Sequence, residues 1–159
     1  MLANAIKKRL SKEEGQKGFT LIELLAVIVI LGIIAVIAIP LIGNIINKSK
    51  EDSDLATARQ VYDAARLYVT AEKNGAFKSQ VVNVKDSSAT DDLTDKGYIE
   101  GNIYLPSNKE VISGGTVTFD ASGNLTSVIL YTSSHTPTGT GANAPISFTG
   151  EQVLSQKKE

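Results

Sequence analysis

The sequence predicts an α+β fold, in which one long N-terminal helix packs by its second half on a small antiparallel β-sheet. Three observations lead to this prediction. Residues 19–43 contain a single charged residue, Glu23, and residues 24–43 contain no polar side chain. Residues 55–69 then repeat apolar side chains at spacings of three and four, which is the period of an amphipathic helix. Two runs of β-forming side chains follow in 115–131, with a four-residue turn between them.

The apolar segment 19–43 is long enough to cross a bilayer, since about 20 apolar residues at the helical rise suffice. We therefore expect the first half of the long helix to be hydrophobic and membrane-spanning. A carboxylate inside such a segment is costly unless it is paired. Glu23 therefore needs a functional explanation.

The residues alone leave three interpretations of this segment open. A secretory signal peptide has an apolar core of about 7–15 residues before a small-residue cleavage site, whereas this segment is longer and 35–38 is a poor site of that kind. A plain membrane anchor fits the length but does not explain Glu23. In the third interpretation a leader is removed before the apolar segment, which stays on the mature chain. Five basic residues among the first 18 favour a cytoplasmic N-terminus.

The string at residues 17–25, Lys-Gly-Phe-Thr-Leu-Ile-Glu-Leu-Leu, closely resembles the processing site of type IV prepilins and related pseudopilins. The resemblance implies that residues 1–18 are a leader, that a prepilin peptidase cuts between Gly18 and Phe19, and that the same enzyme methylates the new amine of Phe19. It also implies that the precursor waits in the cytoplasmic membrane as a single-pass protein. An assembly platform protein and an ATPase would then build it into a filament of identical subunits.

The spacing of Phe19 and Glu23 fits this processing on physical grounds. Cleavage would create an α-amine four residues before the carboxylate, which is about one helical turn. A second subunit at another height could also offer its amine to Glu23. Either pairing lowers the cost of burying both charges. The resemblance implies the intersubunit pair, and the alternative is a carboxylate that simply lies among the lipid headgroups.

Gly32 and Pro40 are expected to weaken the apolar helix. Proline lacks the N–H that the carbonyl of Val36 would need, and its ring favours a kink. Glycine is less favourable than alanine in a helix by about 1 kcal/mol. The resemblance implies that the stretch between such residues melts on assembly, although both residue types are also common in ordinary membrane helices.

The apolar stripe after residue 54 predicts that the helix continues, nearly unbroken, from residue 19 to 74. Lys73 in the last turn and Gly75 just beyond it form a stop signal. We therefore expect a chain divided into a removed leader (1–18), a hydrophobic transmembrane and polymerisation helix (19–43), an amphipathic continuation (44–75) and a C-terminal β-rich globular region (76–159).

The C-terminal region is predicted to be mainly β. Residues 115–120 and 125–131 form a hairpin around the turn at 121–124, and 81–84 and 146–148 are candidate short strands. Residues 91–98 are expected to form a short helix that docks Leu93 and Tyr98, 136–145 a surface loop, and 156–159 a frayed end. Because a lone hairpin is marginally stable, it must pack on the amphipathic helix, which gives the ladle shape that the resemblance implies.

The composition excludes most catalytic and metal-binding chemistry. The chain has no cysteine and a single histidine, His135, so thiol catalysis, catalytic triads and most zinc sites are out of reach. Residues 120–124 lack the spacing of a calcium-binding loop and are better explained as a turn. The net charge of −1 gives no indication of nucleic-acid binding. We expect no cofactor, no metal and no enzymatic activity.

The function that this sequence predicts is that of a pilin, the structural subunit of a type IV pilus on the bacterial surface. The resemblance equally admits a pseudopilin of a type II secretion or competence (DNA-uptake) apparatus. A hypothesis of another class is a monomeric, single-span, membrane-anchored protein whose β-region binds a ligand. A secreted soluble protein with an unusual signal peptide is a fourth and weaker interpretation.

Overall fold

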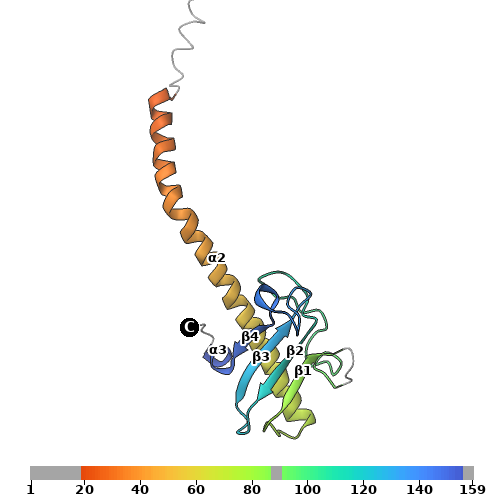
Figure 1. Ribbon diagram of the computed structural model, residues 1–159. Helices are drawn as coiled ribbons and strands as arrows, with labels where there is room; N and C mark the ends of the chain where they lie inside the picture. The colour runs from red at the N-terminus through yellow and green to blue at the C-terminus, as the bar shows by residue number, and fades with distance from the viewer. Residues whose placement is uncertain (1–18, 87–90, 156–159) are drawn as a thin grey trace, which may run out of the picture. The chain divides into compact units, whose positions relative to one another are not determined.

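A computed structural model describes residues 19–86 and 91–155 of the chain (Figure 1). A first compact unit ends at Ile45, and a second begins at Ile46. The elements follow in the order α2 (Leu21–Glu72), β1 (Val81–Lys85), β2 (Gly114–Phe119), β3 (Leu125–Tyr131), η1 (Gly141–Asn143), β4 (Ile146–Thr149) and α3 (Gly150–Ser155). The predicted α+β class, a long apolar N-terminal helix followed by a small antiparallel sheet, is confirmed.

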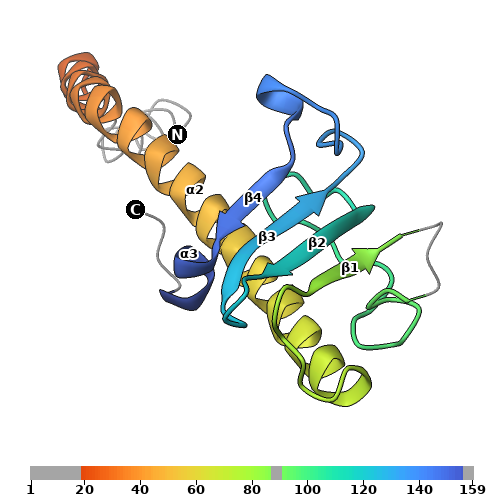
Figure 2. The same cartoon turned by 60° about the horizontal axis from the view of Figure 1, so that its bottom comes forward.

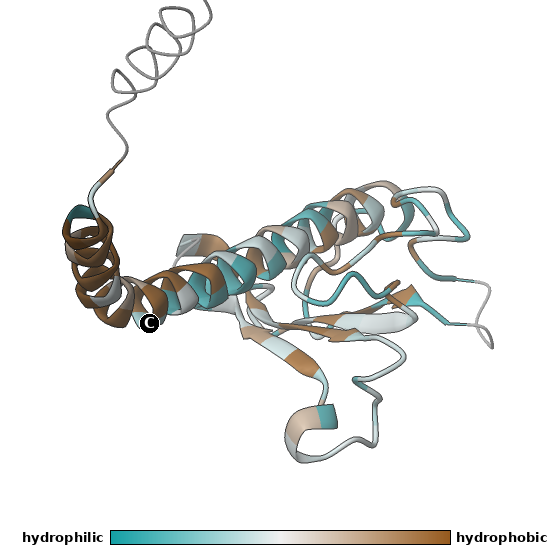
Figure 3. Ribbon diagram, turned by 90° about the horizontal axis from the view of Figure 1, so that it is seen from above, coloured by the Kyte–Doolittle hydropathy of each residue, from teal (hydrophilic) through white to brown (hydrophobic). Residues whose placement is uncertain are grey.

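The described part of the first unit is the apolar part of α2, preceded by Phe19 and Thr20. Its described large side chains are exposed, for example Leu25 at 53% and Ile37 at 67%. Figure 3 shows hydrophobic colour on this part of the helix, whereas the later turns are mixed. The helix continues through Gly32 and Pro40 without a break. Nothing within the described chain covers this apolar surface.

The second unit is built by packing the later turns of α2 on one face of the sheet. The buried residues of α2 all lie between Asp54 and Val69 and recur at helical spacing. Tyr62 of the helix meets Phe119 of β2, with ring centroids 6.2 Å apart. Val117, Val128 and Leu130 contribute fully buried side chains from the sheet. Burial of each such side chain contributes about 1.5–3 kcal/mol, so this interface is the core of the unit.

The sheet is an antiparallel meander in the order β1-β2-β3-β4 (Figure 2). Val117 pairs with Val128 in the β2–β3 hairpin, which confirms the predicted hairpin. The turn between β2 and β3 is closed by Asp120, whose Oδ1 accepts the N–H of Ser122 at 2.7 Å and of Asn124 at 2.8 Å. The candidate strands at 81–84 and 146–148 are confirmed as β1 and β4. Residues 136–145 form a loop with one turn of 3-10 helix.

The end of α2 is close to the predicted position. The helix ends at Glu72, and the N–H groups of Lys73 and Gly75 both donate to the carbonyl of Val69. Asn74 and Gly75 have φ values of 53° and 74°, so the left-handed conformation that glycine and asparagine tolerate best stops the helix. The prediction for 156–159 lies outside the described residues.

The prediction of a helix at 91–98 is wrong. This segment is a series of turns, because Gly97, with a left-handed φ of 74°, stops the chain after a single helical turn. The Asp92 carboxylate caps the start of that turn. Its Oδ1 accepts the N–H of Asp95 at 2.7 Å, and its Oδ2 accepts that of Asp86 at 2.9 Å. The expected docking of this segment does occur, since Leu93 is fully buried and Tyr98 packs against the core.

Sequence reasoning missed the short helix α3. It begins with reciprocal bonds between Thr149 and Gln152: the Thr149 N–H donates to Gln152 Oε1 at 2.9 Å, and the Gln152 N–H donates to Thr149 Oγ1 at 3.3 Å. At its other end, Arg59 Nη1 of α2 donates to the carbonyls of Val153 and Leu154, both at 3.0 Å. The Thr-x-x-Gln spacing at 149–152 was the sequence signal for its start.

Candidate functional site

The residues predicted to act in processing lie at the start of the described chain. The predicted leader, including Gly18, lies outside the described residues. Phe19 and Thr20 precede α2 and are not helical, and the Phe19 side chain is 87% exposed. Phe19, the residue after the predicted cut, therefore lies just outside the helix.

Glu23 and Thr20 begin α2 with a capping box. The backbone N–H and the hydroxyl of Thr20 each donate to Oε2 of Glu23, both at 2.7 Å. The N–H of Glu23 donates in return to Thr20 Oγ1, at 3.3 Å. Each residue thus satisfies a donor that the first turn of a helix leaves unpaired.

This arrangement gives Glu23 a partner within its own chain, Thr20, in addition to the Phe19 amine that the sequence predicts. The Thr-x-x-Glu spacing before an apolar run is the sequence signal for this capping box. Both Thr20 bonds go to Oε2. An ionised carboxylate can accept about four hydrogen bonds, so the cap leaves acceptor capacity for an amine.

Gly32 and Pro40 lie inside the exposed apolar part of α2. A Cβ atom built on Gly32 would meet nothing within 4 Å, so no neighbour in the described chain requires a glycine there. Pro40 is also surrounded by exposed side chains. Their role in weakening the helix stays a prediction.

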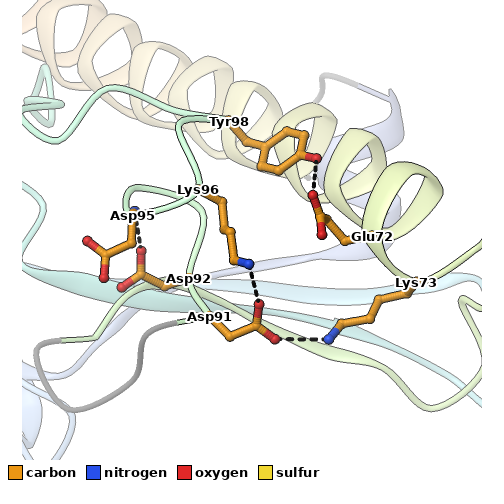
Figure 4. A network of polar contacts seen from close by, with 7 residues as sticks. All are labelled: Glu72, Lys73, Asp91, Asp92, Asp95, Lys96 and Tyr98. Carbon is orange, nitrogen blue, oxygen red and sulfur yellow. Dashed lines mark hydrogen bonds and ion pairs between the residues drawn. The ribbon is translucent and has the colours of Figure 1, made fainter.

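A second polar cluster fixes the loop at 91–98 on the end of α2 (Figure 4). Lys73 Nζ lies 2.9 Å from Asp91 Oδ2, and Lys96 Nζ lies 3.5 Å from Asp91 Oδ1. Tyr98 donates its hydroxyl to Glu72 at 3.2 Å. A hydrogen bond from the Lys73 ammonium, and to a smaller extent one from the Tyr68 hydroxyl, lowers the pKa of Asp91 to about 2. These contacts anchor the loop at 91–98 to the end of α2.

Within 19–86 and 91–155, no group of three or more His, Asp or Glu side chains is placed to hold a metal ion. The oxygens of Asp120 are used by the hairpin turn, including one bond from the Asn124 amide at 3.3 Å. His135 Nδ1 lies 3.1 Å from Thr132 Oγ1. In the described part of the chain, the features that stand out are therefore the capped start of α2 and its exposed apolar surface.

The described residues include one helix, α2, that is long and apolar enough to cross a membrane by length and composition. Its apolar window is not buried in the chain, unlike the core helix of a soluble protein. An apolar N-terminal helix of this kind, followed by a packed helix-and-sheet unit, is a pilin-like arrangement. The comparison with known proteins agrees with this class.

Residues 15–39 match the family described as the prokaryotic N-terminal methylation motif. The chain is 37% identical over 82 residues to the type IV major alpha-pilin of Moraxella bovis, which covers 47% of this chain and 52% of the relative. It is 49% identical over 53 residues to fimbrial protein Q of the same species, 31% of this chain and 34% of that relative. The chain thus matches about half the length of one relative and about a third of the other. No solved structure matches it significantly.

The resemblance to type IV pilins that the sequence analysis inferred from residues 17–25 is confirmed. The chain contains the methylation motif of these proteins and is similar to a type IV pilin and a fimbrial protein.

Proposed function

We propose that this chain is a type IV pilin, a structural subunit that polymerises through the apolar part of α2 into an extracellular filament. The methylation motif and the similarity to a type IV major pilin support this function. The proposed role is structural and involves no catalysis by the chain.

The observation that supports polymerisation best is the exposure of the apolar helix. Soluble monomers rarely expose contiguous apolar patches of more than a few hundred Å². The described residues from 21 to 46 expose nearly every large apolar side chain. Such a surface must be covered by lipid, by copies of itself, or by each in turn. A precursor held in the membrane and a filament built from identical helices supply these two environments.

The proposed processing uses the residues at the start of α2. A prepilin peptidase removes residues 1–18 by cutting between Gly18 and Phe19, and methylates the new amine of Phe19. Methylation leaves the amine protonatable, so it can still pair with a carboxylate. In the filament the Glu23 carboxylate of one subunit pairs with the Phe19 amine of a neighbour, in addition to its cap on Thr20. An assembly platform protein and an ATPase extract the subunits from the membrane.

Two other functions keep specific support. A pseudopilin of a secretion or DNA-uptake apparatus would have the same motif and the same exposed helix. A monomeric membrane-anchored binding protein would use the helix as a plain anchor, because α2 is long enough to span a bilayer. The composition of α2 alone fits a pseudopilin and a plain anchor equally well. The methylation motif favours a pilin or a pseudopilin over a plain anchor.

The test is fractionation of the native host. We expect the chain in a fraction sheared from the cell surface, in long fibres that an antibody against the chain decorates in electron micrographs. Recovery of the chain only from the membrane, as a monomer by chemical crosslinking, would overturn the proposal in favour of a plain anchor. Absence of long fibres, together with a secretion or DNA-uptake defect on deletion, would indicate a pseudopilin.

A further inference from the structure

A small hollow lies on the face of the sheet that points away from α2. Its volume is about 290 Å³, close to the lower end of small-molecule sites. It lies where β1 and β3 end and β2 begins, which in an antiparallel meander is one end of the sheet. The polymerisation proposed above does not use this region.

Strand register explains why its side chains gather there. Val117 and Leu130 point into the core beneath the sheet, so Gly114 and Thr116 of β2 and Tyr131 of β3 belong to the opposite face. Gly114 is paired with Tyr131, and Asn83 of β1 is paired with Thr116. The pairing therefore brings an aromatic ring, an amide and a hydroxyl together on the outward face.

The glycine at position 114 determines the shape of the hollow. A Cβ atom there would lie 3.2 Å from Cδ2 of the Tyr131 ring and 3.1 Å from the carbonyl oxygen of Lys85. Both distances are tighter than an ordinary contact, so a larger residue would push on the ring and narrow the space. Glycine lets the half-buried ring lie close to the strand at the edge of the hollow.

The chemistry of the lining narrows the class of ligand. The hollow has one cationic side chain, Lys85, and one anionic side chain, Asp86, so it does not favour a multiply charged anion. Its amide and hydroxyl groups would be left unpaired by a purely apolar ligand. A ligand with many hydroxyl groups and one apolar face satisfies both kinds of group. The negative face of an aromatic ring attracts the weakly positive C–H groups of a sugar ring.

We propose that this hollow, formed by Tyr131, Gly114, Asn83 and Thr116, binds one neutral pyranose unit of a carbohydrate. The Tyr131 ring stacks on the apolar face of the sugar, and the Asn83 amide and Thr116 hydroxyl bond to its hydroxyl groups. This binding function goes beyond polymerisation and does not depend on it, since the hollow belongs to a single chain.

The experiment is saturation-transfer NMR on the full chain in a detergent without a sugar headgroup, such as lauryldimethylamine oxide. The probes are methyl β-galactopyranoside, methyl α-mannopyranoside and methyl N-acetyl-β-glucosaminide, each titrated separately. For a ligand of this size we expect a dissociation constant of about millimolar for at least one probe. Absence of saturation transfer to all three probes at tens of millimolar, about ten times that constant, would overturn the proposal.

Matched variants locate the site. Tyr131→Ala should weaken binding about tenfold because it removes the stacking ring, whereas Tyr131→Phe should keep most of it. Gly114→Ala should weaken binding by narrowing the hollow. Tyr104→Ala is the control, because Tyr104 is 57% exposed and does not line the hollow. Thermal melting checks that each variant is folded. Equal affinity in Tyr131→Ala and the wild type, or equal loss in Tyr104→Ala, would contradict the assignment.

Discussion

At the scale of single residues, the carboxylate of Glu23 has two roles that can be separated by mutation. It caps α2 through Thr20, and in the proposed filament it pairs with the Phe19 amine of a neighbour. Glu23→Ala removes both roles, whereas Thr20→Val removes only the hydroxyl and keeps the charge at position 23. We expect Glu23→Ala to lower filament yield about tenfold or more, because the amine then has no anionic partner in apolar surroundings.

The Thr20→Val variant should assemble at close to the normal level. Sheared filament per cell is the measurement for both variants, and total chain in the membrane is the control for expression. Processing should be intact in each, as judged by the mass of the membrane-bound chain. Normal filament yield from Glu23→Ala would contradict the pairing role, and equal loss in Thr20→Val would assign the effect to the cap.

A second residue-scale prediction concerns the cut site. Gly18→Leu should leave the leader attached, since the resemblance to prepilins makes Gly18 the residue before the scissile bond. Lys17→Leu is a neighbouring control that changes the leader without changing that residue. Intact mass of the membrane-bound chain separates the processed and unprocessed forms. Complete processing of Gly18→Leu would place the cut elsewhere.

A third prediction concerns acid stability. Lys73 and Tyr68 lower the pKa of Asp91 from its ordinary 3.8 to about 2 in the folded chain. Because the folded pKa is the lower one, the stabilisation is present above about pH 4 and is lost as the pH falls toward 2. Asp91→Asn should therefore make the free energy of unfolding less dependent on pH between 4 and 2, as measured by urea titration. Lys73→Met removes the partner and should flatten the same interval, and an unchanged slope in both variants would contradict this account.

At the scale of elements, local sequence pattern predicted most of the fold. The apolar run and the stripe that follows it predicted α2, and the turn at 121–124 predicted the hairpin of β2 and β3. These elements follow from periodicity and turn chemistry, which act over a few residues. The stop at Asn74 and Gly75 was equally local.

The elements that sequence reasoning missed depend on single residues or on distant partners. Segment 91–98 forms no helix because Gly97, in the left-handed conformation, stops it after one turn, although its apolar residues dock as expected. The helix α3 is too short for periodicity to reveal, and Arg59, more than ninety residues away in sequence, holds its C-terminal end. The charge of Glu23 predicted the site at the start of α2, whereas the capping box that Glu23 forms with Thr20 was not predicted.

The packing of α2 on the sheet makes a prediction at this scale. Leu130 of β3 is completely buried, so Leu130→Ala should lower the free energy of unfolding of the second unit by about 2–5 kcal/mol. Leu67→Ala deletes the same atoms from a side chain that is 59% exposed, and should change stability by less than about 0.5 kcal/mol. Denaturant unfolding followed by circular dichroism measures both. Equal effects of the two substitutions would contradict the core assignment.

At the scale of the whole molecule, the two units bury their apolar surface in different ways. The second unit covers its own core with α2, the sheet and the loop that carries Leu93. The first unit buries almost none of its apolar surface, so its apolar helix needs an environment that one chain does not provide. This division supports the proposed life cycle, in which the same helix meets first lipid and then other subunits.

The most direct test of this account is the N-terminal mass of the chain in filaments sheared from the native host. The account predicts a chain that begins at Phe19 and has one added methyl group on its amine. A chain that still begins at Met1, recovered only from the membrane, would contradict it and would make α2 a plain membrane anchor.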